Sequence, residues 1–262
     1  MHEHERERQI LEQLKRSGFV SFQDLDSQLE ASPATIRRDL ARLAEQGQLQ
    51  RVRGGARLID GGTHAPGAAP GSLSGVPFHE NIGRYPLQKA AIGKAAASLC
   101  RSGEAVMIDG GSTTLQMCPH LAGLNLQVLT NSLHIVSALL PQAGTRILVP
   151  SGTVFRDQNI ILAASGEDSM PRFHAPRLFM GAAAIGPQGV MQADVLLVAA
   201  ERRLIDRADE IVMLVDSSKF LGPSGNVVCD LAEIDVIITD SGISERDRKM
   251  IEDAGIRLIA AT

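Results

Sequence analysis

Apolar residues recur with the period of a helix in the first part of the chain. The apolar positions of two successive stretches are Ile10, Leu11, Leu14, Leu25 and Leu29. Gly18 follows the first stretch as a residue that ends helices. Ser21 begins the second stretch three residues before Asp24, as in a capping box. The pattern predicts two short helices, one ending at Gly18 and one starting at Ser21.

A third helix is predicted with both of its ends. Ser32 stands at the N-cap, and Pro33 takes the first helical position, where no partner is needed for its missing N–H. Gly47 is placed to end the helix in a left-handed conformation. The apolar side of this helix is formed by Ile36, Leu40 and Leu43. We expect the helix to pack through that side.

The opposite side of this helix is small, hydroxylic and basic. At about 100° per residue, Ala34, Arg38 and Ala41 face away from the apolar side, and Thr35, Arg37 and Arg42 flank them. Arginine can fork onto guanine or phosphate, threonine can bond to either, and alanine allows close approach to a groove. This face is typical of a helix that reads double-stranded DNA, with candidate contacts at Ser32, Ala34, Thr35, Arg37, Arg38 and Arg42.

A β-hairpin is predicted after this helix. Residues 49–53 and 56–58 flank Gly54 and Gly55, and the arginines Arg51, Arg53 and Arg57 would make the hairpin a basic wing. Arg51 and Arg53 complete the candidate DNA contacts. The alternative is a three-helix packing module whose arginines are only solvated, because helix-turn-helix patterns are short.

The charge of the chain is distributed unevenly. The net charge is −4, but residues 32–58 carry six arginines against Asp39 and Glu45, a local balance of +4. Acidic surface elsewhere does not cancel a basic patch beyond a Debye length of about 8 to 10 Å.

The three cysteines are isolated, which favours neither disulfides nor a zinc site, and we expect no metal and no cofactor. The start of the chain does not resemble a signal peptide and no apolar run approaches the length of a membrane span, so we expect a cytoplasmic protein with no membrane contact.

Composition divides the chain into three parts. Residues 60–77 are rich in glycine, proline, alanine and serine and lack periodicity, which predicts a flexible linker or an inert spacer. Residues 1–59 form the expected winged helix-turn-helix domain, and residues 78–262 form a second domain.

The second domain alternates short apolar strands with helices. Strands are predicted at 105–109, 127–130, 146–149, 178–182, 211–215, 236–239 and 257–260, and helices at 89–99, 193–207 and 245–254. This order predicts an α/β domain with a mostly parallel sheet, whose ligands bind at the carboxyl ends of the strands.

A glycine-rich loop follows the first of these strands. Asp109 ends the strand, and the loop continues through Gly110, Gly111, Ser112, Thr113 and Thr114 into a predicted helix. Backbone N–H groups and hydroxyls at a helix start suit a phosphate. Neither the lysine of a Walker A loop nor a Gly-x-Gly-x-x-Gly fingerprint is present, which disfavours nucleotide hydrolysis and NAD binding. A purely structural turn is the alternative reading of this loop.

Other strand ends carry polar residues as well. They are Thr130, Asn131 and Ser132, Ser151 to Thr153 around Gly152, and Asp216 to Lys219. Loops that meet at one sheet edge would form a pocket for a polyhydroxy phosphate, with Lys219 as the charge partner and Asp109 accepting from hydroxyls.

Both halves resemble the DeoR family of bacterial repressors. In the first half the resemblance is carried by residues 32–40, Leu43, Gly47, Leu49 and 51–56, and in the second by Lys89, 108–114, 130–132, Glu201 and 216–220. It implies a sensor domain similar in fold to ribose-5-phosphate isomerase and a sugar-phosphate or polyol-phosphate effector that relieves repression. Glu201 and Gly152 join the candidate effector-binding residues on this ground.

The sequence departs from the family pattern at two places. Ser151 and Gly152 replace the usual pair of glycines, and Asn81 stands where many members carry arginine. The helix that bears Glu201 resembles the ascorbate-phosphate-responsive branch more than the deoxynucleoside branch.

The expected function is a DNA-binding repressor of a carbohydrate or polyol operon, acting as a homodimer or homotetramer and not as an enzyme. The alternative is a sugar-phosphate isomerase fused to a DNA-binding head, with Asp109 or Glu201 as the base.

Overall fold

A computed structural model describes most of the chain. The described residues are 3–17, 19–21, 25, 29, 31–45, 48–52, 55–58, 76–162, 170–220 and 225–262. The chain divides into two compact units, Met1–Pro70 and Gly71–Thr262, and each is treated by itself. The predicted linker, 60–77, lies outside the described residues except for Val76 and Pro77.

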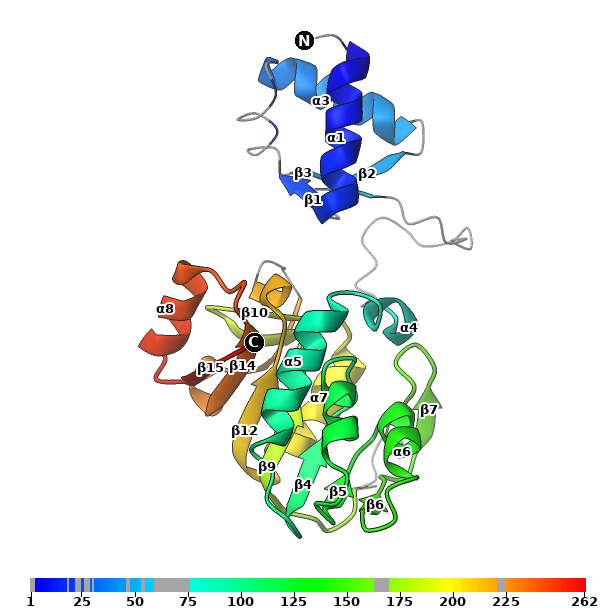
Figure 1. The fold of residues 1–262 in the computed structure, drawn as a ribbon, viewed down its shortest axis with the longest axis vertical. Helices are drawn as coiled ribbons and strands as arrows, with labels where there is room; N and C mark the ends of the chain where they lie inside the picture. Colours follow the sequence, from blue (N-terminus) through cyan, green and yellow to red (C-terminus); the bar gives the residue numbers. More distant parts are fainter. Residues whose placement is uncertain are drawn as a thin grey trace. The chain divides into compact units, whose positions relative to one another are not determined.

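The first unit packs helices on a small antiparallel sheet (Figure 1). Its elements are α1 (Glu3–Ser17), β1 (Phe19–Ser21), α3 (Pro33–Glu45), β2 (Leu49–Val52) and β3 (Gly55–Leu58). The strands lie in the order β1-β3-β2. One buried cluster joins the side chains Ile10, Leu14, Val20, Leu25, Leu29, Ile36, Leu40, Leu43, Leu49 and Ala56. The apolar stripes of the first and third predicted helices are therefore core-facing, as expected.

The stretch around Ser21 differs from the prediction. Ser21 ends the strand β1, in which Val20 lies opposite Ala56 of β3. The N–H of Leu29 donates to the carbonyl of Leu25 at 2.9 Å, a bond that spans one helical turn. Asp24 and most of the expected second helix lie outside the described residues. The strand was missed because its pairing partner is far away in the sequence, and three residues give no local periodicity.

The second unit is built on a seven-stranded sheet. In the order of the sheet, the strands are β15 (Arg257–Ala261), β14 (Val236–Asp240), β12 (Ala208–Leu214), β9 (Ala175–Met180), β4 (Ala105–Ile108), β5 (Gln127–Leu129) and β6 (Arg146–Leu148). All six neighbouring pairs are parallel. Every predicted strand is present, and the expected parallel α/β architecture is confirmed.

Helices cover both faces of this sheet (Figure 1). The helices α5 (Pro86–Ala97), η1 (Thr114–His120) and α6 (Leu133–Leu139) share a buried cluster with Val106 and Ile108 of β4. The helices α7 (Val195–Ile205) and α8 (Glu245–Asp253) share a second cluster with Met107. Successive residues of a strand point to opposite faces, so β4 contributes side chains to both buried clusters. This explains why all four residues of β4 are apolar.

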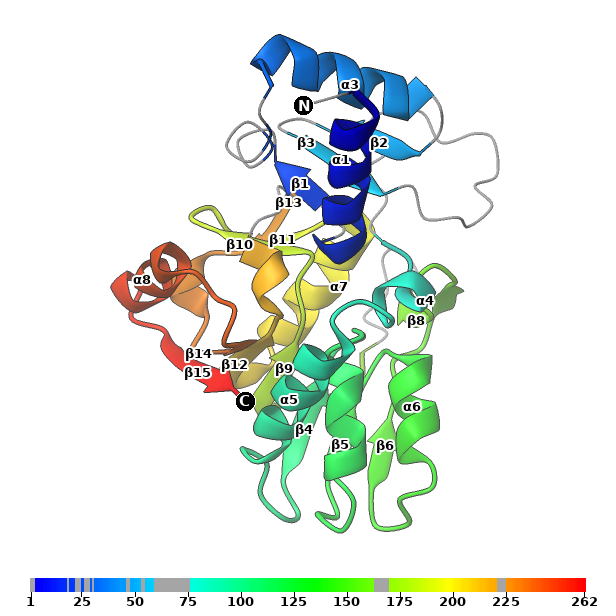
Figure 2. The same ribbon diagram turned by 45° about the horizontal axis from the view of Figure 1, so that its top comes forward.

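Smaller elements flank the sheet. They are α4 (Phe78–Asn81), the hairpin β7 (Thr153–Phe155) and β8 (Ile160–Leu162), the antiparallel strands β10 (Ala184–Gly186), β11 (Gly189–Gln192) and β13 (Asn226–Cys229), and the short helices η2 (Ser217–Phe220) and η3 (Leu231–Glu233). Figure 2 shows β11 and β13 beside α7, which they contact. None of these strands was predicted, because each is short and pairs outside the main sheet.

Gly93 allows α5 to pack tightly against η1. A Cβ at this position would lie 2.5 Å from the backbone carbon of Gln116, closer than two carbon atoms can approach. We expect Gly93→Ala to destabilise the second unit by about 1 to 3 kcal/mol, the usual cost of overpacking. Urea unfolding followed by circular dichroism measures the change. Gly83→Ala is the control, since a Cβ there meets only the carbonyl oxygen of Glu80, at 3.8 Å. Equal stability of the two variants would contradict the packing described.

Candidate functional site

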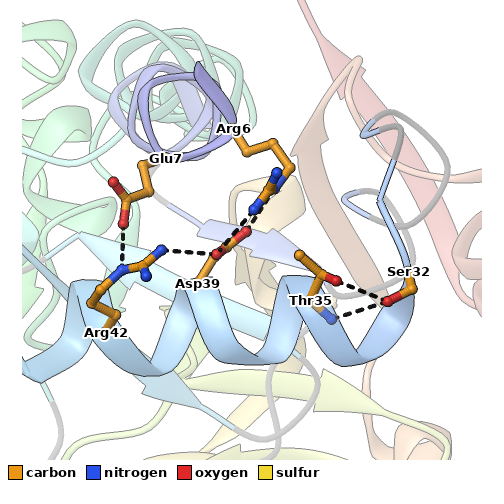
Figure 3. Close-up of polar contacts among 6 residues, drawn as sticks. All are labelled: Arg6, Glu7, Ser32, Thr35, Asp39 and Arg42. Carbon is orange, nitrogen blue, oxygen red and sulfur yellow. Dashed lines mark hydrogen bonds and ion pairs between the residues drawn. The ribbon is translucent and has the colours of Figure 1, made fainter. Parts of the chain in front are cut away.

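The helix α3 begins as the sequence predicts. Pro33 is its first residue, and the N–H of Thr35 donates to Oγ of Ser32 at 3.3 Å. The hydroxyls of Ser32 and Thr35 are 2.9 Å apart and share a further hydrogen bond (Figure 3). Ser32 therefore acts as the N-cap. At the other end, the N–H of Gln48 donates to the carbonyl of Leu43 at 2.9 Å, and Gly47 lies outside the described residues.

The outward face of α3 has the predicted exposure. Ala34, Arg37 and Arg38 are exposed, while Thr35 and Ala41 are partly buried. This face combines two guanidinium groups with small side chains, which is the chemistry that suits a major groove.

Asp39 was counted only as a charge in the sequence, but it lies at the centre of an ion-pair network (Figure 3). Its side chain is 2% exposed, and its carboxylate accepts from Nε of Arg6 at 2.8 Å and from Nη2 of Arg42 at 3.0 Å. Nε of Arg42 also donates to Oε1 of Glu7 at 2.8 Å. Arg42, a predicted DNA contact, is thus engaged with two acidic residues of its own unit. Asp39 and Arg42 are three residues apart on one helix and so form a local pair, but no local signal reveals Arg6, which is 33 residues from Asp39.

The predicted wing is present as a hairpin. The strands β2 and β3 pair in antiparallel fashion from Leu49 opposite Leu58 to Val52 opposite Gly55. Arg53 and the side chains of Arg51 and Arg57 lie outside the described part of the chain, so their DNA contacts stay predictions.

A pocket of about 150 Å³ lies at the carboxyl ends of β4, β5, β9 and β12. This is the edge at which ligands of parallel sheets bind. The predicted effector residues that line it are Asp109, Gly110, Gly111, Ser112, Thr113, Asn131, Glu201 and Lys219. Residues the sequence did not single out for binding also line it, among them Asn81, Phe155 and Gln192. The structure thus brings loops from distant parts of the chain to one place.

Asn131 ties two of these loops together. Its Nδ2 donates to Oδ1 of Asp109 at 3.0 Å, and its Oδ1 accepts from the N–H of Gly110 at 3.0 Å. A Cβ on Gly110 would lie 2.4 Å from Cγ2 of Ile160, so only glycine fits where the loop passes β8. Burial raises the pKa of Asp109 to about 6, although the bonds from Gly110 and Asn131 oppose the shift.

Glu201 of α7 faces the same pocket with one oxygen unused. Its side chain is buried, and Oε1 accepts from Nε2 of Gln192 at 2.6 Å. Oε2 is buried and has no hydrogen-bond partner within the described residues. Burial, and then the charge of Asp109, raise the pKa of Glu201 well above its usual value. The pocket therefore contains a carboxyl group that favours its protonated form.

One lysine lines the pocket, and a second is bonded to Asn81, which lines it too. Lys219 lines it, and burial lowers the pKa of Lys219 while Asp216 opposes the shift. Lys89 is 1% exposed, and its Nζ donates to the carbonyl oxygen and to Oδ1 of Asn81. Burial lowers the pKa of Lys89 to about 8, and the charges of Lys219 and Arg84 act in the same direction. Lys89 was noted only as part of a family motif, because nothing in its local sequence links it to Asn81 or Lys219.

Four predicted effector residues do not line the pocket. Thr114 is buried and its hydroxyl donates to the carbonyl of Asp109 at 2.8 Å. Thr130 accepts from the N–H of Ser132 at 3.1 Å, and Ser132 caps α6. Gly152 is exposed just before β7. The first three hold the loops in shape, and direct contact of any of the four with a ligand stays a prediction.

Among the described side chains, no group of three or more His, Cys, Asp or Glu is placed to hold a metal ion. Within the same part of the chain, no helix has the length and apolar character needed to cross a membrane.

Comparisons with known proteins assign both units. Residues 6–61 match the DeoR-like helix-turn-helix domain, and residues 85–241 match the DeoR C terminal sensor domain. Two proteins named HTH-type transcriptional regulator UlaR, from Shigella dysenteriae serotype 1 (strain Sd197) and Escherichia coli (strain SMS-3-5 / SECEC), are each 30% identical over 260 residues, 99% of the chain and 99% of either relative. These relatives are named as regulators, in agreement with the expectation that the chain is not an enzyme.

Solved structures match more weakly. Ribose 5-phosphate isomerase A from Methanocaldococcus jannaschii is 16% identical with a TM-score of 0.38, and the match covers 50% of this chain and 53% of the isomerase. The beta subunit of eIF2B from Chaetomium thermophilum is 15% identical with a TM-score of 0.38, covering 58% and 48%. The chain spans about half the length of these structures.

The buried carboxyl groups make stability depend on pH. Because folding raises the pKa of Asp109 from 3.8 to about 6, its protonated form favours the folded state, and that stability is lost as the pH rises through this interval. We expect Asp109→Asn, which stays neutral, to be more stable than the unmodified chain at pH 8 by up to about 3 kcal/mol, at about 1.4 kcal/mol for each pH unit. Urea unfolding between pH 4 and pH 8 measures the difference, which should vanish at the acidic end. The control is Glu252→Gln, an exposed carboxyl. Parallel pH curves for Asp109→Asn and the unmodified chain would contradict the burial of this charge.

Proposed function

The chain belongs to the DeoR family of transcriptional regulators, and on this premise we propose that it represses a carbohydrate or polyol operon until a phosphorylated sugar or polyol releases it from its operator. The observation that carries the proposal is the pocket, in which a glycine-rich loop, a lysine and two buried carboxyl groups face one small volume. DNA binding and a sensor for a small-molecule effector follow from the family. The direction of control and the chemistry of the effector are proposed.

The phosphate is assigned to the loop after β4. Gly111 to Thr113 supply backbone N–H groups and the hydroxyls of Ser112 and Thr113, while the N–H of Gly110 is bonded to Asn131. Lys219 supplies the positive charge that a phosphate requires. We therefore assign the charged end of the effector to this side of the pocket.

The hydroxyl groups of the effector are assigned to the carboxyl side. Asp109 presents a carboxyl group that can bond to hydroxyls, and Oε2 of Glu201 needs a partner because it is buried without one. The volume of about 150 Å³ is below the roughly 300 to 1,000 Å³ of pockets for larger ligands. These features favour a short polyol or sugar phosphate over a dinucleotide.

DNA recognition is assigned to the exposed face of α3 and to the wing. The proposed contacts are Ser32, Ala34, Thr35, Arg37, Arg38, Arg51 and Arg53. We further propose a homodimer or homotetramer, whose paired helices read half-sites about 34 Å apart or a multiple of that distance. Analytical ultracentrifugation of the protein–DNA complex measures its mass and so the number of chains bound to each operator. A single chain per operator would contradict the proposed assembly.

The central experiment is a gel shift with the promoter of the gene that encodes this chain. It is titrated with a panel of sugar, polyol and ascorbate phosphates and with their unphosphorylated parents. We expect one phosphorylated compound to abolish the shifted band while its parent does not. A tighter band would contradict repression relieved by the effector, and turnover of the compound would support the isomerase alternative instead.

Arg38→Ala tests the recognition helix. Loss of a forked arginine contact should weaken promoter binding by about tenfold to a hundredfold, and leave binding to a scrambled duplex less affected. Fluorescence anisotropy with both duplexes measures this. Arg246→Ala, an exposed arginine of α8, is the control. Unchanged promoter affinity in Arg38→Ala would remove Arg38 from the interface.

Lys219→Ala tests the phosphate side of the pocket. We expect promoter binding to persist, and the concentration of the releasing compound needed for half-release to rise by about tenfold or more, because a charge-assisted contact is lost. The same gel shift measures it, with Lys249→Ala on the exposed side of α8 as the control. A normal response in Lys219→Ala would show that the phosphate binds elsewhere.

A further inference from the structure

The ion-pair network of the first unit alternates in charge across two helices. Arg6 and Glu7 are neighbours on α1, while Asp39 and Arg42 lie one turn apart on α3 (Figure 3). The pairs Arg6–Asp39, Asp39–Arg42 and Arg42–Glu7 link the four in a chain. Only Arg42, at 30%, has more than a small part of its side chain exposed. The network therefore lies between the helices and not on an open surface.

The other contacts between α1 and α3 give little directional control. Ile10 and Leu14 of α1 pack in the same apolar cluster as Ile36, Leu40 and Leu43 of α3. Apolar burial is nondirectional, so it tolerates small rotations and translations of one helix on the other. Charge-assisted hydrogen bonds have strict geometry, and the planar guanidinium group enforces it most strongly. The network thus restricts the orientation of the helix that presents Arg38.

Arg42 uses two different nitrogen atoms in this network. Nε donates to Oε1 of Glu7 at 2.8 Å, and Nη2 donates to Oδ1 of Asp39 at 3.0 Å. Around α3, Arg42 is a flanking residue, next to the side on which Asp39 faces α1. A phosphate contact would compete with both acidic partners for the same guanidinium group.

We propose that Asp39 and Arg42 are positioning residues, which set the orientation of α3 on α1 for DNA recognition, and that Arg42 does not contact DNA. Asp39 holds the centre of the network through Arg6 and Arg42. Glu7 fixes the outer end of Arg42. The proposal needs only DNA binding by the first unit and is independent of the effector and of the direction of control.

Glu7→Gln distinguishes positioning from contact by the sign of its effect. If Arg42 bound phosphate, removing its acidic partner would release the guanidinium group and remove a negative charge near DNA, so affinity would rise or stay equal. If Arg42 positions α3, promoter affinity should fall by about tenfold, the equivalent of one charge-assisted hydrogen bond, while affinity for a scrambled duplex stays equal or rises. Anisotropy with the full chain and both duplexes gives the two affinities. Glu12→Gln, also on α1, is the matched control.

Arg42→Lys provides an independent test. Lysine keeps the positive charge and serves well as a phosphate ligand, but its single nitrogen does not reproduce the two-atom arrangement of Nε and Nη2. We expect Arg42→Lys to lose about as much promoter affinity as Glu7→Gln, and the salt dependence of binding to the scrambled duplex to keep its slope. If Arg42 contacted a phosphate, lysine would keep that contact, and the promoter affinity of Arg42→Lys would change little.

Hydrogen exchange of residues 33–45 completes the test. Reduced promoter affinity with protected amides in this segment supports positioning. Promoter affinity that is unchanged or higher in Glu7→Gln, or unchanged in Arg42→Lys, overturns the proposal. Loss of protection in α3 overturns it as well, because the network would then maintain the helix itself and not its orientation.

Discussion

Charged side chains lie buried in both units, and each must find a partner or give up its charge. An isolated ion in an apolar interior is so unfavourable that its pKa shifts until the neutral form prevails, unless an opposite charge or several hydrogen bonds compensate. The first unit meets this constraint with ion pairs around Asp39. The second unit meets it only in part, because Asp109 and Glu201 have amide partners but no cation among their contacts in the described residues. Ion pairs suit a rigid DNA-binding unit, and carboxyl groups without a cation suit a unit that a ligand stabilises.

The buried carboxyl groups that lack a cationic partner determine what the pocket can bind. Oε2 of Glu201 has no hydrogen-bond partner among the described residues, and the side-chain amide of Asn131 bonds to both Asp109 and Gly110. A site left unsatisfied in this way lowers the stability of the empty protein and leaves an interaction for a ligand to complete. A hydroxyl-rich ligand can provide that interaction without bringing a second charge next to the carboxyl groups. The same burial shifts Lys89 and Lys219 toward their neutral forms, which an anionic ligand would reverse.

The sequence predicts the elements whose signal is local. The inner parallel strands β4, β9, β12 and β14 contain runs of buried apolar residues, and polar residues after the strands mark the pocket edge. Ser32 and Pro33 mark the start of α3 for the same reason. The strands β1 and β13 were missed because their partners are far away in the sequence. The hairpins β7–β8 and β10–β11 pair locally, but strands of three or four residues are too short to show a clear alternation. The pairing of Asp39 with Arg6 depends on the same kind of long-range packing.

Ion pairing within the first unit also reconciles an acidic chain with DNA binding. The total charge is −4, and DNA responds to the charge that a surface presents within about a Debye length, roughly 8 to 10 Å. Glu7 and Asp39 would oppose a phosphate backbone if they were exposed, but Arg6 and Arg42 neutralise them between α1 and α3. Arg37 and Arg38 then dominate the outward face of α3. The network thus neutralises two acidic side chains of the first unit and holds the helix that carries Arg37 and Arg38. Arg42 accordingly contributes to DNA affinity more by the position it enforces on α3 than by the charge it adds.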